Sequence, residues 1–257
     1  MSTIALTGSA SGIGAATAQR LAAAGHRLIG IDLRNADVAA DLSTSEGRSQ
    51  AVSAILERCG GALDALVLCA GLGAHVEPAS TVAAVNYFGA VALLDGLLPA
   101  LQKGQSPCAV VVSSVASTQL PWEKNPIGAA LEAGDEARVA AVLAGAGPRA
   151  GHLAYAGSKN ALTVAVRRRA ADWGRAGVRL NTVAPGAVET PLLQGGLADP
   201  RYGQAIKDFV APIARRARPD EVAAMIAYLI GPDAGFIHGA QFFVDGGVDA
   251  MMRPTQF

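Results

Sequence analysis

The sequence carries little charge and no excess of either sign. Only 16% of its 257 residues are charged, and 21 lysines and arginines balance 21 aspartates and glutamates. Nucleic acids select proteins with clustered positive charge, which a neutral chain with few charges lacks. The short basic runs Arg167-Arg168-Arg169 and Arg215-Arg216 are therefore interpreted as solvated faces, and no nucleic-acid partner is expected.

Cysteine and histidine are also scarce. The three cysteines, Cys59, Cys69 and Cys108, form an odd count without close pairing, which suits a reducing cytoplasm. The four histidines are too scattered to suggest a metal cluster. Strand-like sequence begins at Thr3 without a basic leader, and no apolar stretch looks long enough to cross a bilayer. We therefore expect a cytoplasmic protein that neither spans a membrane nor holds a metal ion.

Hydrophobic residues, in contrast, make up 51% of the sequence. Strands of a sheet that is covered on both faces are continuous apolar runs, and this composition is typical of such a sheet. No linker rich in proline, glycine or serine divides the chain, and its length suits one large α/β domain. We predict a single domain over residues 1–257, built as a doubly wound parallel sheet flanked by helices.

A glycine-rich turn follows the first expected strand, at residues 3–6. The turn has the sequence Gly8-Ser9-Ala10-Ser11-Gly12-Ile13-Gly14 and leads into an alanine-rich helix that ends near Ala24. Small residues let the backbone approach a pyrophosphate, and the helix N-terminus offers free amide groups to it. The spacing differs from the fingerprint Gly-x-Gly-x-x-Gly, so a turn without a ligand is the alternative. The predicted cofactor residues here are Gly8, Ser9, Ser11, Gly12, Ile13 and Gly14.

The second expected strand, at residues 26–31, ends on Asp32, eighteen residues after Gly14. An acidic residue at this position binds the ribose 2′-hydroxyl of NAD and repels the 2′-phosphate of NADP. Arg34 is the complication, because a nearby arginine accepts a 2′-phosphate, although it is equally well a plain surface residue. The sequence favours NAD as the cofactor.

Two further segments are expected at the same end of the sheet. Asp41 and Leu42 close a short third strand and are expected to flank the adenine. The buried strand at residues 63–69 runs into a second glycine turn, Ala70-Gly71-Leu72-Gly73. Because ligands in such sheets bind at the carboxyl ends of the strands, Gly71 is expected to contact the cofactor.

Tyr155 and Lys159 stand four residues apart, in what we predict to be the first turn of a long helix that ends near Trp173. At that spacing both side chains lie on one helix face. A tyrosine has a reference pKa near 10, and lowering it to about 7 costs roughly 4 kcal/mol. One positive charge about 4 Å away supplies roughly that energy. The pair predicts an acid/base unit, although a packed tyrosine beside a solvated lysine has the same spacing.

Two polar positions lie in apolar sequence between these motifs. Asn86 stands early in an apolar helix that continues to about Lys103, where it either bends the helix or places a hydrogen-bonding group. Ser113 and Ser114 follow the buried strand at residues 109–112, and serines at strand ends commonly cap turns. Neither position predicts a function by itself.

In this order, the motifs resemble those of the short-chain dehydrogenase/reductase family. Each motif is weak alone, but the ordered set is specific and covers essentially the whole chain. The motifs are Gly8-x-x-x-Gly12-x-Gly14, Cys69-Ala70-Gly71, Asn86, Ser114, Tyr155-x-x-x-Lys159 and Pro185-Gly186. The resemblance implies a Rossmann-type fold and NAD-linked interconversion of a secondary alcohol and a ketone.

The resemblance also implies a role for each residue. Tyr155 would exchange the proton with the substrate oxygen, while Lys159 lowers the pKa of Tyr155 and holds the nicotinamide ribose. Ser114 would bind the substrate oxygen, and Asn86 would hold a water that links Lys159 to solvent. Thr190, after Pro185-Gly186, would bind the nicotinamide carboxamide. The expected catalytic residues are thus Asn86, Ser114, Tyr155 and Lys159; Ser114 and Tyr155 contact the substrate, and Tyr155 and Lys159 also contact the cofactor.

The sequence departs from the family pattern in two places. Leu68-Cys69 stand where the family often has two asparagines, which puts the cofactor contact from that position in doubt. The distance from Ser114 to Tyr155 is 41 residues, much longer than most members show. A polar, proline-containing stretch and then a helical composition fill it, so we expect a helical insertion over about residues 118–150, at the rim of the active site.

The loop after Pro191 mixes glycine and proline with Leu192, Leu193 and Leu197. Mobile loops of this kind close over apolar ligands, although core packing is the plainer role for any one leucine. The expected substrate is a steroid-like or similarly apolar alcohol or ketone. An NADPH-dependent reductase of acyl-chain ketones or other carbonyls is the rival enzyme, against which Asp32 argues. A non-catalytic NAD sensor is the other rival, but a pure binder would not need all four catalytic residues.

The insertion also bears on assembly. Many members of the family pair the helices of Asn86 and Tyr155 across a four-helix interface, and an inserted helical segment would crowd that surface. The helix expected at Pro219–Ile230 and the strand at residues 240–244 are more apolar than a solvent-facing edge should be. Their apolar side chains are Met225, Ile226, Tyr228, Leu229, Phe242 and Phe243. We expect a homodimer through these elements, with the insertion as active-site wall and block to tetramers; a monomer that buries both elements is the alternative.

Overall fold

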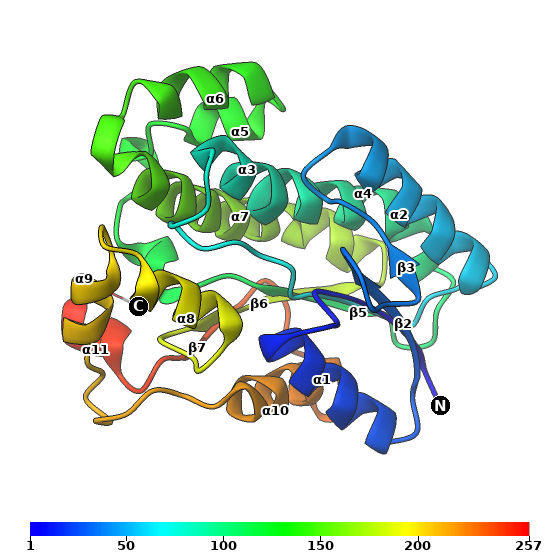
Figure 1. Ribbon diagram of the computed structural model, residues 1–257. Coiled ribbons are helices and arrows are strands. Elements are labelled where there is room, and N and C mark those ends of the chain that lie inside the picture. The colour runs from blue at the N-terminus through cyan, green and yellow to red at the C-terminus, as the bar shows by residue number, and fades with distance from the viewer. Residues whose placement is uncertain (257) are drawn as a thin grey trace.

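A seven-stranded parallel sheet with helices on both faces forms the protein in the computed structural model, which describes residues 1–256 (Figure 1). The strand order is β3-β2-β1-β4-β5-β6-β7, and each neighbouring pair is parallel. The chain builds outward from β1 to β3, then returns to place β4 on the other side of β1 and builds outward again. The direction therefore reverses between β1 and β4, which makes the sheet doubly wound and confirms the predicted fold class.

Central strands are buried along their whole length. β4 and β5 have no exposed residue, because helices cover both faces of the sheet. The bounds of the strands are β1 (Thr3–Thr7), β2 (Arg27–Asp32), β3 (Val38–Ala39), β4 (Ala65–Leu68), β5 (Cys108–Val112), β6 (Arg179–Pro185) and β7 (Gln241–Val244). Because β3 ends at Ala39, Asp41 and Leu42 lie beyond the third strand and not at its end, which corrects the prediction.

Helices α1 and α10 cover one face of the sheet, and α2, α4 and α7 cover the other (Figure 1). The bounds of the helices are α1 (Gly12–Ala23), α2 (Ser45–Arg58), α3 (Ala79–Ala83), α4 (Ala90–Leu101), α5 (Gly128–Glu132), α6 (Glu136–Ala144), α7 (Ala150–Arg175), α8 (Pro191–Ala198), α9 (Gly203–Asp208), α10 (Pro219–Ile230) and α11 (Val248–Met252). Because α7 begins at Ala150, Tyr155 lies in the second turn of this helix. The prediction that Tyr155 lies in the first turn was therefore wrong.

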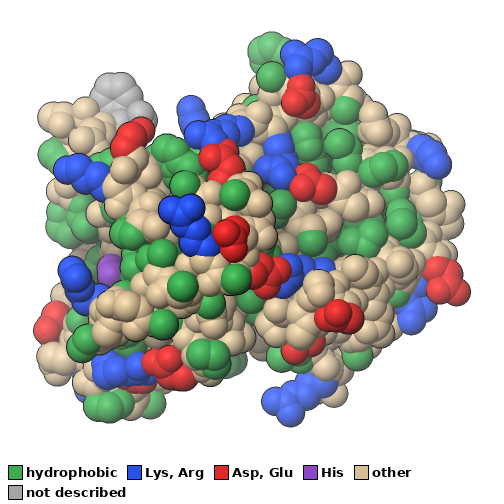
Figure 2. All heavy atoms as spheres, turned by 90° about the horizontal axis from the view of Figure 1, so that it is seen from above, with side chains coloured by type: hydrophobic (Ala, Val, Ile, Leu, Met, Phe, Trp, Pro, Cys, Tyr) green, Lys and Arg blue, Asp and Glu red, His purple; other side chains and the backbone are tan. Residues whose placement is uncertain are grey.

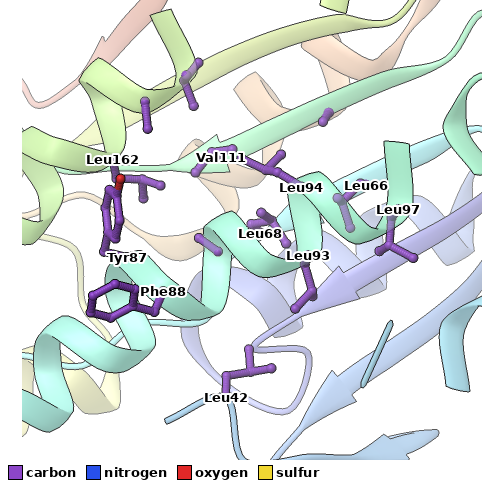
Figure 3. Packing of buried hydrophobic residues seen from close by; sticks show 14 of the residues in the cluster. Leu42, Leu66, Leu68, Tyr87, Phe88, Leu93, Leu94, Leu97, Val111 and Leu162 are labelled. Atoms are coloured by element: carbon purple, nitrogen blue, oxygen red, sulfur yellow. The ribbon is translucent and has the colours of Figure 1, made fainter. Parts of the chain in front are cut away.

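The alternation of side chains along the strands divides the core into two apolar clusters. Leu66 and Leu68 of β4 point to the α4 side, where they pack with Leu93, Leu94 and Leu97 (Figure 3). The intervening residues of β4 point to the α1 and α10 side. Burying one such leucine stabilises the fold by about 1.5–3 kcal/mol. The two clusters hold the sheet rigid between its helical layers, so that loops at the strand ends start from fixed positions.

Helix α4 continues an earlier helical segment. α3, a π-helical turn at Ala84–Gly89 and α4 follow one another without a break from Ala79 to Leu101. This segment is long and apolar enough to cross a membrane by length and composition alone. The expectation that no segment has this length was therefore wrong. Its most apolar window has a mean hydropathy of 1.6 and is 61% buried in the fold, because the sheet and α7 pack against it.

The predicted insertion before Tyr155 is helical. α5 and α6 form it, together with 3-10 turns at Trp122–Lys124 and Gly147–Arg149. α5 packs on α7, and α6 packs on α3 and α7, so the insertion covers the outer face of the helices that carry Asn86 and Tyr155 (Figure 1). Seen from above, acidic and basic side chains are interspersed on the visible face of the molecule (Figure 2).

Candidate active site

A pocket of about 530 Å³ opens at the carboxyl ends of the strands, where the order of the sheet reverses. It is lined by all of the predicted site residues except Ser9 and Asn86. The predicted residues in its wall are Gly8, Ser11, Gly12, Ile13, Gly14, Asp32, Asp41, Leu42, Gly71, Ser114, Tyr155, Lys159 and Thr190. The fold thus brings residues that are far apart in the sequence into one cavity.

The glycine turn between β1 and α1 has no room for larger side chains. Gly8 and Gly12 have positive φ angles of 69° and 53°, which favour glycine. A Cβ at Gly14 would lie 2.0 Å from the carbonyl oxygen of Gly8, so the turn closes only with glycine there. The first turn of α1 therefore presents unpaired amide groups to the pocket at close range, as a pyrophosphate requires. These residues fit a dinucleotide.

Ser9 is the exception within the turn. Its amide donates to the carbonyl of Ile31 at 3.3 Å, and its side chain lines a shallow groove next to Gly30 and Asp37, outside the main pocket. Alternate residues of a tight turn point in opposite directions, and the spacing alone did not show which of them face the pocket. The prediction that Ser9 belongs with the cofactor residues is therefore corrected.

Asp32 is the last residue of β2 and stands at the end of the pocket away from Tyr155. Its Oδ2 accepts a hydrogen bond from the amide of Ala10 at 2.9 Å, and its Oδ1 accepts one from the amide of Leu33 at 2.7 Å. These bonds fix the carboxylate where β2 and the glycine turn meet. Arg34 is exposed and does not line the pocket, so its position suits a surface residue.

The phenol of Tyr155 points at the serine that follows β5. Its hydroxyl donates to Ser114 Oγ at 3.3 Å, and the same oxygen accepts from the amide of Ala116 at 3.1 Å. Ser114 therefore accepts two hydrogen bonds and keeps its own proton for a further acceptor. A substrate oxygen in the pocket is such an acceptor.

Lys159 lies one turn further along α7, 4% exposed. Its Nζ donates to the carbonyl oxygen of Val112, the last residue of β5, at 2.7 Å. Burial disfavours the charged form and lowers the pKa of Lys159 from 10.5 to about 8. The lysine is therefore positively charged at neutral pH inside a largely apolar wall.

The pKa of Tyr155 departs from what the resemblance implied. Burial raises the pKa of the phenol above 10, and the hydrogen bond with Ser114 lowers it in part. Lys159 does not contribute to the lowering of this pKa, and its Nζ donates to the Val112 carbonyl. In the structure, the phenol is thus a neutral acid at pH 7, a correction to the expectation.

Asn86 lies behind the pocket wall, in the π-helical turn. Its Oδ1 accepts from the amide of Leu72 at 2.8 Å and its Nδ2 donates to the carbonyl of Leu72 at 3.0 Å, so the amide side chain fixes the second glycine turn. A Cβ at Gly71 would lie 3.2 Å from Asn86 Oδ1 and 3.5 Å from Lys159 Nζ, so Asn86 is near the lysine. Each of the two atoms keeps one further hydrogen-bonding position, and a water relay through Asn86 stays a prediction.

Cys69 stands where the family often has asparagine, and its side chain lines the pocket. Burial raises the pKa of the thiol to about 12, while the charge of Lys159 lowers it in part. The thiol is therefore neutral and unreactive at physiological pH. It contributes a small apolar surface beside the lysine.

The segment after β6 closes the pocket next to the glycine turn, because a Cβ at Gly12 would lie 3.2 Å from Thr190 Cγ2. Thr190 caps α8: its Oγ1 accepts from the amide of Leu193 at 3.2 Å. The expected loop is thus a short helix, and Leu192 and Leu193 from it line the pocket. Leu197 does not line the pocket, and no residue of the insertion at 118–150 does so within the described chain, so the insertion is not an active-site wall.

Sequence reasoning missed several residues of the wall. Pro185 and Gly186 belonged to the recognised motif set but were not predicted to line the pocket. Val112 and Val188 also line it, and no motif marks them. The role of Val112 depends on its backbone carbonyl, which any residue would supply. Within residues 1–256, no three His, Cys, Asp or Glu side chains are grouped so that they could hold a metal ion.

Comparison with known proteins agrees with this site. A family model described as short chain dehydrogenase matches residues 2–130, and one described as enoyl-(acyl carrier protein) reductase matches residues 139–249. The chain is 61% identical to 3-alpha-hydroxysteroid dehydrogenase/carbonyl reductase of Comamonas testosteroni, over 100% of both chains. This chain belongs to the short-chain dehydrogenase/reductase family. It is an oxidoreductase of that family.

Two further members of the short-chain dehydrogenase/reductase family show the same likeness. Coniferyl-alcohol dehydrogenase of Pseudomonas sp. (strain HR199 / DSM 7063) is 36% identical over 95% of both chains. The crystal structure of 3-alpha-hydroxysteroid dehydrogenase from Pseudomonas sp. B-0831, complexed with NADH, superposes with a TM-score of 0.97 at 57% identity and covers 100% of both chains. The fold is thus that of the family.

The depressed pKa of Lys159 predicts a pH-dependent difference in stability. Between pH 8 and 10.5 the unfolded chain binds the lysine proton and the folded chain does not, so this group makes stability rise with pH. Relative to Lys159→Met, the unaltered protein should gain about 3 kcal/mol in free energy of unfolding across that interval. Urea unfolding of both proteins at several pH values measures the difference. A constant difference, or one of the opposite sign, would contradict the assigned pKa.

Proposed function

We propose that this protein interconverts a secondary alcohol and a ketone with NAD as its cofactor, and that its substrate is a steroid or a similarly apolar molecule. The observation that carries the proposal is the contact of the Tyr155 hydroxyl with Ser114 Oγ, beside Lys159, in the pocket that the glycine turn enters. The 61% identity to a 3-alpha-hydroxysteroid dehydrogenase/carbonyl reductase supports the substrate class.

Different residues of the pocket would bind different parts of the cofactor. The amides of the glycine turn would hold the pyrophosphate, Asp32 the adenine ribose, and Thr190 the carboxamide of the nicotinamide. Asp41 and Leu42 would flank the adenine. When bound, the nicotinamide supplies or accepts the hydride. The remaining chemistry is a proton transfer, which belongs to the chain's own residues.

In ketone reduction the phenol of Tyr155 donates its proton to the substrate oxygen as hydride reaches the carbonyl carbon. Ser114 donates a second hydrogen bond to the same oxygen, and Lys159 would hold the nicotinamide ribose. In alcohol oxidation the steps reverse, and tyrosinate accepts the hydroxyl proton while hydride leaves the carbinol carbon. Because burial raises the pKa of Tyr155, oxidation should be favoured by higher pH and reduction by lower pH.

An apolar substrate suits the pocket wall next to Tyr155. Leu72, Val188, Leu192 and Leu193 line the cavity, and Cys69 is a neutral thiol. Apolar walls with few convergent polar groups bind apolar ligands and exclude water. Two similar proteins are named as dehydrogenases of the 3-alpha-hydroxyl of steroids. The 3-alpha-hydroxyl or 3-keto group is accordingly the proposed reacting group, with other carbonyls as further substrates.

A panel of steroid alcohols, simple ketones and 3-oxoacyl thioesters, assayed with NAD(H) and NADP(H), tests the proposal. We expect turnover of steroid alcohols with NAD. Tyr155→Phe should lower turnover about 10²-fold to 10⁴-fold while NADH binding, measured by fluorescence titration, is retained, because the ring stays and the proton carrier is lost. Near-normal turnover in this variant would exclude the mechanism. Thioester reduction with NADPH alone, or NADH binding without turnover, would favour the rival functions.

Cofactor preference depends on the charge at Asp32. Asp32→Asn keeps an oxygen that accepts hydrogen bonds and removes the repulsion of a 2′-phosphate. The ratio of kcat/KM for NAD to that for NADP should fall at least about tenfold, or about 1.4 kcal/mol. Asp37→Asn is the matched control, because Asp37 accepts from the amide of Gly30 and lies outside the main pocket. An unchanged ratio in Asp32→Asn would make Asp32 only a cap of the turn.

We also propose that the protein is a cytoplasmic homodimer. The three cysteines are free, which suits a reducing compartment. Of the predicted interface residues, Ile226 and Leu229 are fully buried against the chain's own core, so they are not available to a partner. Tyr228 is 45% exposed, and Phe236, in the turn between α10 and β7, is fully exposed. β7 is an edge strand, and its side chains are partly exposed.

Sedimentation equilibrium tests this assembly. We expect a dimer, because α10 and β7 present aromatic side chains at an open edge while α5 and α6 cover the outer face of α7. Phe236→Ser should weaken the dimer at least about tenfold, whereas Val210→Ser, at another exposed apolar position, should leave it unchanged. A stable tetramer would contradict the hypothesis that the insertion prevents tetramer formation. A monomer at micromolar concentration would contradict the proposed interface through α10 and β7.

A further inference from the structure

Two buried asparagines connect the helical insertion to the catalytic helix. Asn125 belongs to the insertion and Asn160 follows Lys159 in α7; their exposures are 8% and 7%. The Nδ2 of Asn125 donates to the Oδ1 of Asn160 at 3.1 Å. Neither side chain lines the pocket, and the mechanism does not use them. A buried pair of amides at this place therefore needs another explanation than substrate or cofactor binding.

Asn160 holds the segment that follows Ser114. Its Nδ2 donates to the carbonyl of Ser117 at 2.9 Å and to that of Leu120 at 3.2 Å. Ser117 in turn closes a 3-10 turn on Ser114, because its amide donates to the Ser114 carbonyl at 3.0 Å. The Asn160 side chain thus links α7 to the turn that begins at Ser114.

Asn125 holds the catalytic helix from the other side. Its Nδ2 also donates to the carbonyl of Gly157 at 2.9 Å, and its Oδ1 accepts from the amide of Ile127 at 3.2 Å. Gly157 lies midway between Tyr155 and Lys159, and a Cβ there would lie 2.9 Å from the side chain of Ile127. The insertion therefore rests directly on the backbone between the two catalytic residues.

Both amide groups are hydrogen-bonded through their oxygen and their nitrogen, which fixes their orientation. Each Nδ2 makes two hydrogen bonds and each Oδ1 accepts one. Fully satisfied buried networks of this kind rigidify the elements that they join. Here the joined elements are the insertion, the stretch of α7 between Tyr155 and Lys159, and the turn that begins at Ser114.

We propose that Asn160, held by Asn125, is a positioning residue that sets the place of Ser114 Oγ relative to the Tyr155 phenol. The insertion then acts as a brace on the catalytic helix, on the side away from the pocket. This inference rests on the proposed function, since Tyr155 and Ser114 must be the proton donor and its partner. Small displacements of reacting groups cost large factors in rate, which gives the brace a catalytic effect.

The hydrogen bond between Tyr155 and Ser114 affects the pH profile of oxidation. A variant that only destabilises the fold should leave this profile unchanged. If Ser114 moves away, the phenol loses the partner that lowers its pKa, and the pH at which oxidation becomes active rises. The other titratable side chains in the pocket wall are Lys159, Cys69, Asp32 and Asp41. None of these contacts Asn125 or Asn160 through a hydrogen bond in the described structure.

The experiment compares Asn160→Ala and Asn125→Ala with Asn181→Ala in the full-length protein. Asn181 is a matched control in β6, because it is also fully buried and its amide bonds the backbone of Ile237 and Ala240, away from the Ser114 turn. We expect kcat for steroid alcohol oxidation to fall about tenfold to 100-fold in Asn160→Ala, with less than about a threefold change in KM for NAD. The pH profile of kcat should move upward in this variant and stay in place in Asn181→Ala.

A double variant separates positioning from general destabilisation. In a Ser114→Ala background, Asn160→Ala should cause no further shift of the pH profile, because the hydrogen bond it protects is already absent. Equal losses of kcat in the Asn160 and Asn181 variants, or a profile shift that persists without Ser114, would overturn the proposal. If Asn160→Ala does not fold, Asn125→Ala gives a milder test, because it removes the donor that orients the Asn160 amide. Its loss of kcat and its shift of the pH profile should have the same direction as in Asn160→Ala and be smaller, and an unchanged kcat and pH profile would contradict the proposal.

The same measurements distinguish two kinds of failure. Loss of turnover in Tyr155→Phe and Ser114→Ala, with normal kcat and pH profile in Asn160→Ala and Asn125→Ala, would reject the brace and keep the proposed function. Full turnover in Tyr155→Phe would reject the proposed function itself, and with it the brace.

Discussion

The burial of one ammonium group constrains the whole active site. Lys159 reaches the carboxyl end of β5, where the Val112 carbonyl accepts its hydrogen bond at 2.7 Å. A charge in this position needs a hydrogen-bond acceptor, because burial without one costs several kcal/mol. The need for this hydrogen bond fixes the position of α7 along the carboxyl end of the sheet. Tyr155, one turn earlier, then necessarily faces the serine that follows the same strand.

Burial in this pocket shifts the pKa values of the two members of the acid/base pair in opposite directions. Burial lowers the pKa of Lys159 to about 8 and raises the pKa of Tyr155. The result is a charged lysine beside a neutral phenol at physiological pH, in a wall that is otherwise apolar. Ser114 moderates the phenol by accepting its hydrogen bond, so the geometry of the turn after β5 matters as much as the identity of the serine.

Local spacing explains which parts could be predicted from the sequence. The glycine turn, Asp32 and the Tyr155-x-x-x-Lys159 pair depend on residues close in the chain, so the motif set identified the fold and most of the pocket wall. Properties that arise from packing were missed: the direction of Ser9, the raised pKa of Tyr155, and the position of the insertion outside the pocket wall. The acceptor for Lys159 is a backbone carbonyl, and no side chain in the sequence marks it.

The contacts of the insertion imply that it cannot be removed as a module. Beyond its asparagine, it contributes Glu136, which binds the buried Arg48 at 2.6 Å, and Arg48 also donates to the carbonyl of Leu42 beside the pocket. Excising residues 118–150 would leave Asn160 without its donor, Arg48 without its carboxylate and an apolar helix uncovered. A shortened enzyme would need substitutions at each of these positions. Any redesign of the protein should therefore change the insertion together with the residues that contact it.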